Sequence, residues 1–284
     1  MNVGLRQCYS ISVRFLLLAA IFAAGHRSYA APQSQQILDT SYSKVRSQAE
    51  QGDANAEFLL GYLYEHGQGV PQDYAKAAEN YHAAALQGHS SAENNLGSLY
   101  QHGQGVPKDI GKSFEWYGAS ARHGNPVGQC NLATLYYLGS GTARDFQEAA
   151  KWYRAAADSG SVEAQNSLAV FYYKGFGVAL DYVEAARWVQ LAAQHGMASA
   201  ETNLAYLYEQ GKGLPLDYVA AYTWYSLALA AGDTSGAKRR KELSHLMTRK
   251  QIAEATSLTA TLSVRSQQQS TPASAKGFSL LQSQ

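Results

Sequence analysis

The chain has 284 residues and nearly balanced charge, because 23 lysines and arginines stand against 22 aspartates and glutamates, for a formal net charge of +1. Residues 49–236 are acidic, with 10 basic and 19 acidic side chains and a net charge of −9. Residues 237–254 are basic, with 6 basic and 2 acidic side chains and a net charge of +4. An acidic body with one short basic segment is not the charge distribution of a nucleic-acid-binding protein. The basic segment is either a docking patch or a solvated face that caps the fold.

Residues 1–30 are typical of a secretory signal peptide. A polar stretch with Arg6 and Arg14 precedes the apolar run Phe15–Ala24, and small residues follow where a signal peptidase requires them. The apolar run is about half of the ~20 residues that a membrane-spanning helix needs. We therefore expect cleavage after Ala30, export to the periplasm or beyond the cell, and no membrane span in the mature chain. A short uncleaved anchor is the alternative.

The chain has two cysteines, Cys8 and Cys130. Cleavage would remove Cys8, so we expect no disulfide within the mature monomer and a fold stabilised by packing alone. Cys130 is then either a tolerated thiol or a group that bridges two molecules or reacts.

A period of 36 residues organises the chain from Gly52 to Gly232, with the same residue type recurring at each step. Aspartate, leucine, tyrosine and paired glycines each keep a register, and all four tryptophans share one, on which repeat one has Asn80. Such a period indicates like units that stack and contact only their neighbours. The predicted repeats are residues 52–87, 88–123, 124–159, 160–195 and 196–231.

Each repeat is predicted to be a helix hairpin. In repeat one, a first helix over about residues 53–66 and a second over about residues 74–87 flank a glycine-rich turn. Asp73, which recurs in every repeat, can cap the second helix by accepting from its first backbone N–H groups. The paired glycines, such as Gly67 and Gly69, suit the left-handed backbone that ends a helix and reverses the chain.

Comparison of the five copies separates packing positions from variable ones. The nearly constant registers of Ala56, Leu60 and Tyr64 form one face of the first helix, and small residues such as Ala77 and Ala84 recur on the second. Positions 58, 62 and 65 lie on the opposite side of the first helix and change between copies. We expect this stripe to bind a partner, and a drifting solvated face is the alternative. Its members are Phe58, Tyr62, Glu65, Asn94, Ser98, Gln101, Cys130, Thr134, Tyr137, Asn166, Val170, Tyr173, Thr202, Tyr206 and Glu209.

Repeats one and two read Ala-Glu-x-x-Leu-Gly-x-Leu-Tyr-x-x-Gly-x-Gly-Val-x-x-Asp, and a Trp-Tyr pair and a closing glycine follow in repeat two. This pattern resembles the Sel-one-like repeat (SLR) family, which is related to tetratricopeptide repeats. The resemblance covers residues 52–232. It implies an all-α, right-handed superhelical solenoid of five 36-residue hairpins that scaffolds protein complexes, frequently at the bacterial envelope, in signalling or in contact with host cells.

The same resemblance assigns roles to the flanking segments. Residues 31–51 are expected to be a linker and an N-terminal capping helix, and residues 233–256 a single C-terminal capping helix. Residues 257–284, rich in Ser, Gln and Thr with few charges, are expected to be disordered. An exported branch of the family staples each repeat with a disulfide and has been linked to penicillin binding and β-lactam hydrolysis; this chain lacks those cysteines.

Catalytic motifs are weak. Ser41-x-x-Lys44 matches the serine and lysine of penicillin-interacting enzymes, but no Ser-Asp-Asn or Lys-Thr-Gly accompanies it. The histidines lack metal-binding spacing, and the Gly-x-Gly pairs are better explained as turns. We expect no cofactor, no metal and no catalytic residue. The favoured function is an exported scaffold that binds a protein or an extended peptide, with the oligomeric state open; the alternative is an enzyme acting on the cell wall or on β-lactams.

Overall fold

The computed structural model describes residues 42–270, which contain thirteen helices and no strand. A helix over residues 42–50 comes first. Five hairpins follow: α3 (Ala54–His66) with α4 (Tyr74–Leu86), α5 (Ser90–His102) with α6 (Ile110–Arg122), α7 (Pro126–Leu138) with α8 (Phe146–Asp158), α9 (Val162–Lys174) with α10 (Tyr182–Gln194), and α11 (Ala198–Gln210) with α12 (Tyr218–Ala230). The predicted signal peptide and Ser41 lie outside the described residues.

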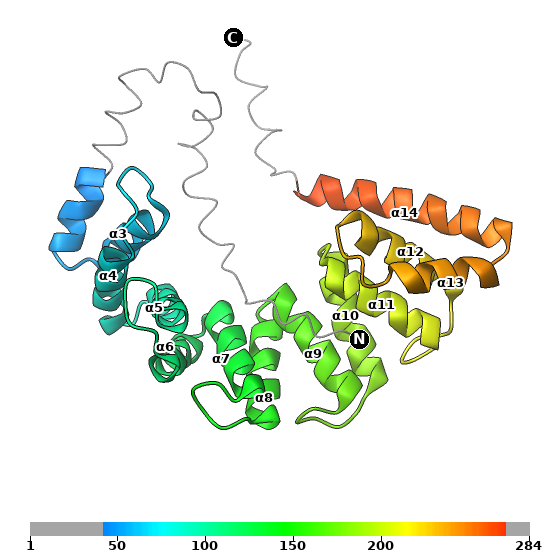
Figure 1. The fold of residues 1–284 in the computed structure, drawn as a ribbon, viewed down its shortest axis with the longest axis horizontal. Coiled ribbons are helices and arrows are strands. Elements are labelled where there is room, and N and C mark those ends of the chain that lie inside the picture. Colours follow the sequence, from blue (N-terminus) through cyan, green and yellow to red (C-terminus); the bar gives the residue numbers. More distant parts are fainter. Residues whose placement is uncertain (1–41, 271–284) are drawn as a thin grey trace, which may run out of the picture. The chain divides into compact units, whose positions relative to one another are not determined.

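The chain divides into two compact units between residues 161 and 162. One contains the helix over residues 42–50 and α3–α8, coloured blue to green in Figure 1, and the other contains α9–α14. Within each unit, the two helices of a hairpin pack against each other and the second helix packs against the first helix of the next hairpin. This order confirms the predicted all-α solenoid of 36-residue hairpins. The right-handed sense of its superhelix stays a prediction.

The recurrent aspartates cap the second helices as predicted. In α8, one carboxylate oxygen of Asp145 accepts from the backbone N–H groups of Gln147 at 2.8 Å and Glu148 at 3.0 Å. In α4, Asp73 accepts in the same way from Ala75 and Lys76, at 3.1 Å each. These bonds satisfy N–H groups that a helix otherwise leaves open and place a negative charge at the positive end of the helix dipole.

In repeats two, three and five, the second glycine of the glycine pair lies against the preceding repeat. Gly141 has φ +73°, and a Cβ added there would lie 2.5 Å from the carbonyl oxygen of Ile110, at the start of α6. Gly105 in repeat two is also left-handed, and a Cβ there would overlap the carbonyl of Tyr74 at the start of α4. Glycine is therefore required at this register both by its backbone conformation and by close contact with the neighbouring repeat.

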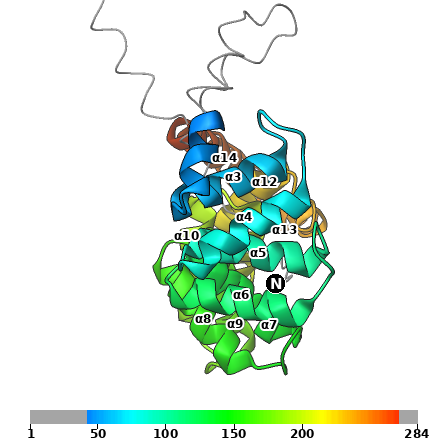
Figure 2. The same cartoon turned by 90° about the vertical axis from the view of Figure 1, so that its left-hand side faces the viewer.

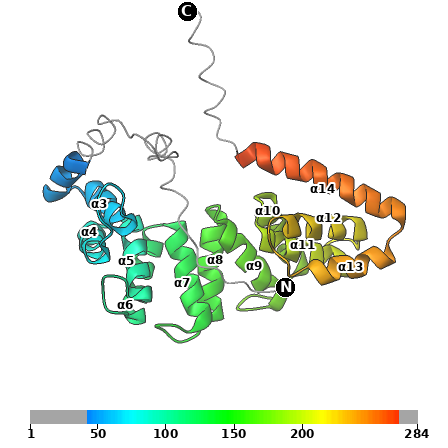
Figure 3. The same ribbon diagram turned by 45° about the horizontal axis from the view of Figure 1, so that its top comes forward.

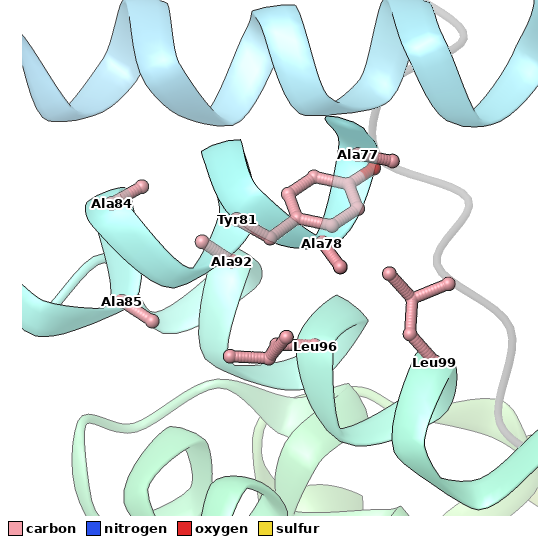
Figure 4. Packing of buried hydrophobic residues seen from close by; sticks show 8 residues of the cluster. All are labelled: Ala77, Ala78, Tyr81, Ala84, Ala85, Ala92, Leu96 and Leu99. Carbon is pink, nitrogen blue, oxygen red and sulfur yellow. The ribbon is translucent and has the colours of Figure 1, made fainter. Parts of the chain in front are cut away.

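Tyrosine, more than tryptophan, forms the centre of the hairpins of repeats one, two, three and five. Tyr81 of α4 is fully buried among alanines of its own helix and Leu96 and Leu99 of α5 (Figure 4). The equivalent Tyr117, Tyr153 and Tyr225 are equally buried, whereas the tryptophans of repeats two, three and five are only half-buried. A small residue on the first helix allows this approach: a Cβ at Gly61 would lie 2.7 Å from a ring carbon of Tyr81.

A helix precedes the first repeat, as predicted, and occupies residues 42–50. Its Ala49 packs with Ala56 and Leu60 of α3, and the hydroxyls of Tyr42 and Tyr64 hydrogen-bond at 2.9 Å. Figure 2, in which the blue end of the chain faces the viewer, shows this helix beside α3. The helix therefore covers the apolar end of repeat one, as a capping helix does.

The C-terminal end differs from the prediction of one capping helix and a disordered tail. Two helices follow repeat five, α13 (Ala237–Leu246) and the 22-residue α14 (Arg249–Ser270). Both contact α12, and α14 runs along it in Figure 3. Met247 and Ala255 are buried against the core of repeat five. The segment was misjudged because its apolar contacts are few and widely spaced, so the helix is stabilised by the surface it covers and not by its composition.

We predict that Gly141→Ala destabilises the first unit by about 2–4 kcal/mol. A left-handed alanine costs about 1–2 kcal/mol, and the collision with the Ile110 carbonyl adds about 1–3 kcal/mol of overpacking. The measurement is urea unfolding followed by circular dichroism. The matched control is Gly124→Ala, at φ +79° with no atom within 4 Å of its added Cβ, which should show the conformational cost alone. Equal losses in the two variants would contradict the proposed contact.

Candidate functional site

The variable stripe of the first helices is less open than the sequence suggested. None of its fifteen residues is exposed. Ten are half-buried, and five are buried: Asn94, Cys130, Asn166, Val170 and Tyr173. Cys130 is 1% exposed within α7, and the expectation of no disulfide within the mature monomer stays a prediction. The expected solvent-facing stripe therefore consists mainly of contacts inside the solenoid.

The reason is that a first helix has neighbours on several sides. Its own second helix and the adjacent repeats all contact it, so the side opposite the constant face is not solvent. The most open line on α3 passes through Asn55, Tyr62 and His66, and it is displaced from positions 58 and 65. Helical periodicity identified the constant face correctly but could not indicate how many other elements surround the helix.

In repeats one, two and five, the residue at position 65 of the stripe accepts a hydrogen bond from the buried tyrosine of its own repeat. The Tyr81 hydroxyl donates to Glu65 at 2.5 Å, and the Tyr117 hydroxyl donates to Gln101 at 2.9 Å. In repeat three, the hydroxyls of Tyr153 and Thr134 hydrogen-bond at 2.9 Å. Burial, followed by the nearby Glu65 carboxylate, raises the pKa of Tyr81, so its hydroxyl stays protonated as a donor. These residues differ between repeats, but each of them hydrogen-bonds the buried tyrosine of its own repeat.

Two other stripe residues join successive repeats. The side-chain carbonyl of Asn94 accepts from Asn131 of repeat three at 2.9 Å, and that of Asn166 accepts from Asn203 of repeat five at 2.9 Å. All four asparagines are at most 6% exposed. A buried amide needs partners, because an unpaired one costs about 1–3 kcal/mol. Asn94 and Asn166 therefore fix the register between hairpins.

Repeat four departs from this pattern. Val189 occupies the tyrosine register and carries no hydroxyl, so the register-65 residue, Tyr173, does not receive a hydrogen bond from it. Tyr173 instead interacts with repeat five: its hydroxyl lies 3.4 Å from that of Tyr206 and accepts from Nζ of Lys212 at 3.0 Å. The Lys212 ammonium also lies 5.0 Å from the ring centroids of both Tyr173 and Tyr182.

The electrostatics of this cluster favour a fixed cation. Burial alone would raise the pKa of Tyr173, but hydrogen bonds with Lys212 and Tyr206 outweigh it, and the pKa is lowered from its usual value. The same hydrogen bond from Lys212 to Tyr173 raises the pKa of Lys212. Lys212 therefore stays charged and is held by tyrosines and not by a carboxylate.

Arg239 of α13 supplies a second cation beside the cluster. Its guanidinium lies 4.8 Å from the ring centroid of Tyr206, and Nη1 donates to Glu209 at 3.0 Å. The other carboxylate oxygen of Glu209 accepts from the hydroxyl of Tyr225 at 2.7 Å. Glu209 thus hydrogen-bonds both side chains, and its carboxylate balances the charge of Arg239 in a partly exposed ion pair.

A pocket of about 210 Å³ lies between repeat five and α13. Its lining consists of hydroxyls, an amide, an aromatic face and a guanidinium: Thr202, Asn203, Tyr206, Tyr225, Ser235, Gly236 and Arg239. Of these, the sequence indicated Thr202 and Tyr206 as partner-binding, but it did not indicate Arg239. We refer to this pocket together with Tyr173 and Lys212 as the tyrosine–cation site.

The structure also bears on two other motifs of the sequence, the serine–lysine pair and the histidines. Ser41 lies outside the described residues, and Lys44 is exposed on the helix over residues 42–50. Nδ1 of His66 and of His102 contacts the backbone carbonyl four residues earlier. Within residues 42–270, no cluster of His, Cys, Asp or Glu could hold a metal ion. No helix in that range is both long and apolar enough to cross a membrane.

Comparison with known families decides what kind of repeat this is. The model of the Sel1 repeat matches residues 54–89, 90–125, 126–161, 162–197 and 198–233. The chain belongs to the Sel1 repeat family. Sel1 repeat proteins are generally protein-interaction scaffolds and are typically not catalytic. No curated protein matches the chain by sequence.

Solved Sel1 repeat structures resemble this chain. One is a protective antigen present in uropathogenic Escherichia coli strains, described as displaying an SLR fold; it is 31% identical, with a TM-score of 0.70, and the match covers 84% of this chain and 53% of the antigen. Another is a Sel1 repeat protein from Oxalobacter formigenes, 29% identical with a TM-score of 0.65, covering 73% of this chain and 88% of that one. The chain thus spans about half the length of the antigen.

In the last Sel1 repeat, a buried carboxylate lacks the partner that its equivalents have. Glu57 accepts from Gln87 at 2.8 Å, and Glu93 accepts from His123 at 2.9 Å, each time from a residue 30 positions later. The corresponding residue for Glu201 is Ala231. Glu201 is 6% exposed, and its Oε2 has no hydrogen-bond partner within the described chain.

Burial and, to a smaller extent, the charge of nearby Asp233 raise the pKa of Glu201 to about 7. Because this folded-state value lies above the usual 4.5, the protonated form is favoured by folding. The stability that Glu201 contributes is therefore complete below about pH 4.5 and is lost as the pH rises through about 7. A neutral side chain would remove this dependence.

We predict that Glu201→Gln raises the free energy of unfolding at pH 8 by on the order of 2 kcal/mol and leaves it nearly unchanged at pH 4.5. Urea unfolding of the wild type and the variant across this range measures the difference. Glu57→Gln is the matched control at the same register, and it should not stabilise because Gln87 already satisfies the Glu57 carboxylate. A constant difference between Glu201→Gln and wild type at all pH values would contradict the assignment.

Proposed function

We propose that this Sel1 repeat protein is an exported, non-catalytic scaffold that binds an extended segment of a partner protein at the tyrosine–cation site. The observation that carries the proposal is the break in the tyrosine register at Val189. It gives Tyr173 a role between repeats, so that Tyr173, Tyr206 and two cations lie together beside a pocket. In repeats one, two and five, the register-65 residue is an acceptor for its own repeat's tyrosine.

The chemistry of the site favours a segment that contains a carboxylate. Arg239 and Lys212 offer N–H groups, while Thr202 and Tyr206 add hydroxyls. Aromatic residues and arginine are enriched at the centres of protein interfaces, because they combine apolar area with directed hydrogen bonds. A pocket of about 210 Å³ accepts one side chain more readily than a folded surface, which favours an extended peptide. Arg239 is paired with Glu209 and Thr202 donates to Asp233 at 2.8 Å, so Lys212, which is held by tyrosines, is the cation left to attract an acidic segment.

We further propose export through the predicted signal peptide and function in the cell envelope or outside the cell, in signalling, regulation or contact with a host. Residues 1–30 carry the charged, apolar and small-residue parts that such a signal requires. Resemblance to a protective antigen supports this placement. The alternative of a cell-wall or β-lactam-acting enzyme depends on Ser41 alone, and no further group of the described chain favours it.

The binding proposal predicts that Lys212→Gln with Arg239→Gln lowers the affinity for the partner at least tenfold. The partner is first identified in cells by a photo-crosslinking residue placed at position 206, with the exposed Glu115 position of α6 as the reference. Binding of the purified partner is then measured by calorimetry. The matched control is Lys238→Gln with Lys241→Gln, which removes the same charge from exposed positions of α13. Equal losses in both double variants would mean that only net charge matters and would contradict the site.

The export proposal predicts that the protein recovered from the cell envelope or medium begins at Ala31. Intact-mass measurement before and after reduction tests both the cleavage and the state of Cys130. A mature chain that still carries residues 1–30, or that is found only inside the cell, would contradict export while leaving the binding experiment unaffected.

A further inference from the structure

One register of the second helices carries a tryptophan in four of the five repeats. These are Trp116, Trp152, Trp188 and Trp224, and repeat one has Asn80 instead. Trp116 shows what the side chain does: it packs against the buried cluster that contains Ala85 and Leu96, and its ring meets His82 of the preceding second helix edge-on at 5.7 Å. The indole thus fills the space between one repeat's second helix and the helix before it.

His82 and the cluster against which Trp116 packs, together with Tyr100 on the same cluster, have equivalents 36 positions earlier. His82 corresponds to Arg46, Ala85 to Ala49, Leu96 to Leu60, and Tyr100 to Tyr64. All four of these equivalent residues line an open pocket of about 340 Å³, together with Asn80 and Ala83. The pocket therefore lies where the other repeats have an indole. We refer to it as the tryptophan slot.

Asn80 does not close this slot. Its side-chain amide donates to the backbone carbonyl of Lys76 at 2.8 Å and so remains near its own helix. Ala49 and Leu60 supply an apolar floor, and the ring of Tyr64 forms one wall. At the rim, Lys76 lies 5.3 Å from the Tyr64 ring centroid. An aromatic ring inserted here would meet the same alanine, leucine and tyrosine registers that surround Trp116, with the ion pair of Arg46 and Glu50 in place of His82 and Leu86.

We propose that the tryptophan slot binds a tryptophan side chain presented by another protein. All four tryptophans of this chain already occupy their own register, so neither a distant segment nor a second copy can supply one without unpacking a repeat. A buried aromatic anchor in a preformed pocket is the usual core of a protein interface. The site belongs to the first unit and shares no residue with the tyrosine–cation site, so the two can be tested independently.

The test uses N-acetyl-L-tryptophanamide as a probe of the mature chain, followed by ¹H–¹⁵N NMR. We expect saturable shifts at the backbone amides of Ala49 and Ala83, with a dissociation constant of ~1 mM, and at least tenfold weaker binding of N-acetyl-L-leucinamide. Asn80→Trp fills the slot from within and should reduce probe binding at least tenfold while raising the unfolding midpoint of the chain. The matched control is Glu115→Trp, an added indole at an exposed position of α6, which should leave probe binding unchanged.

Several results would overturn the proposal. Undiminished probe binding by Asn80→Trp, or shifts that centre on other repeats, would show that the slot is not the site. Failure of Asn80→Trp to fold would show that the slot cannot accept an indole. Self-association of the wild type that Asn80→Trp abolishes would assign the slot to a second copy. Slot shifts caused by deleting residues 271–284 would assign it to the chain's own end.

Discussion

Four of the five hairpins place a tyrosine of the second helix opposite a glycine or alanine of the first, and repeat four has Val189 instead. The small residue allows the ring to lie against the helix backbone, as Tyr81 does on Gly61, and the phenol is fully buried there. A buried hydroxyl must then find an acceptor, because leaving it unpaired would cost about 1–3 kcal/mol. That requirement favours a hydrogen-bond acceptor at position 65, one turn after the small residue of the first helix. In repeats one, two and five, the difference between Glu and Gln at position 65 is therefore two solutions to one constraint, because either side chain serves as the acceptor.

Where one repeat has a different residue at a common register, a neighbouring side chain loses its usual partner or a pocket stays open. Val189 removes a hydroxyl and leaves Tyr173 to join Lys212 and Tyr206. Asn80 replaces an indole and leaves an open pocket, and Ala231 removes the partner of Glu201, whose pKa rises to about 7. A repeat protein makes such departures informative, since every other copy serves as a control for what the position normally does.

The sequence misidentified the exposed side of the first helices for a physical reason. Helical periodicity distinguishes one face of a helix from its opposite, but it does not say what lies against each face. In this stack, adjacent repeats contact positions that a lone amphipathic helix would expose, and Asn94 and Asn166 became bonds between hairpins. The contribution of Arg239 could not be foreseen, because α13 reaches repeat five only through the tertiary fold. The extension of α14 to Ser270 was missed for the same reason.

The sequence by itself determined the features that recur in every hairpin. The 36-residue period, the aspartate caps, the left-handed glycines and the small residues of the helix contacts follow from backbone chemistry within one hairpin and its neighbour. Tertiary structure decided which side chains are exposed to a partner and which are buried or hydrogen-bonded within the fold. Burial and pairing depend on the distance between residues such as Glu209 and Arg239, which are separated by 30 positions and meet only when the helices pack. A periodic sequence pattern cannot predict such a contact, because the contact occurs in one repeat only.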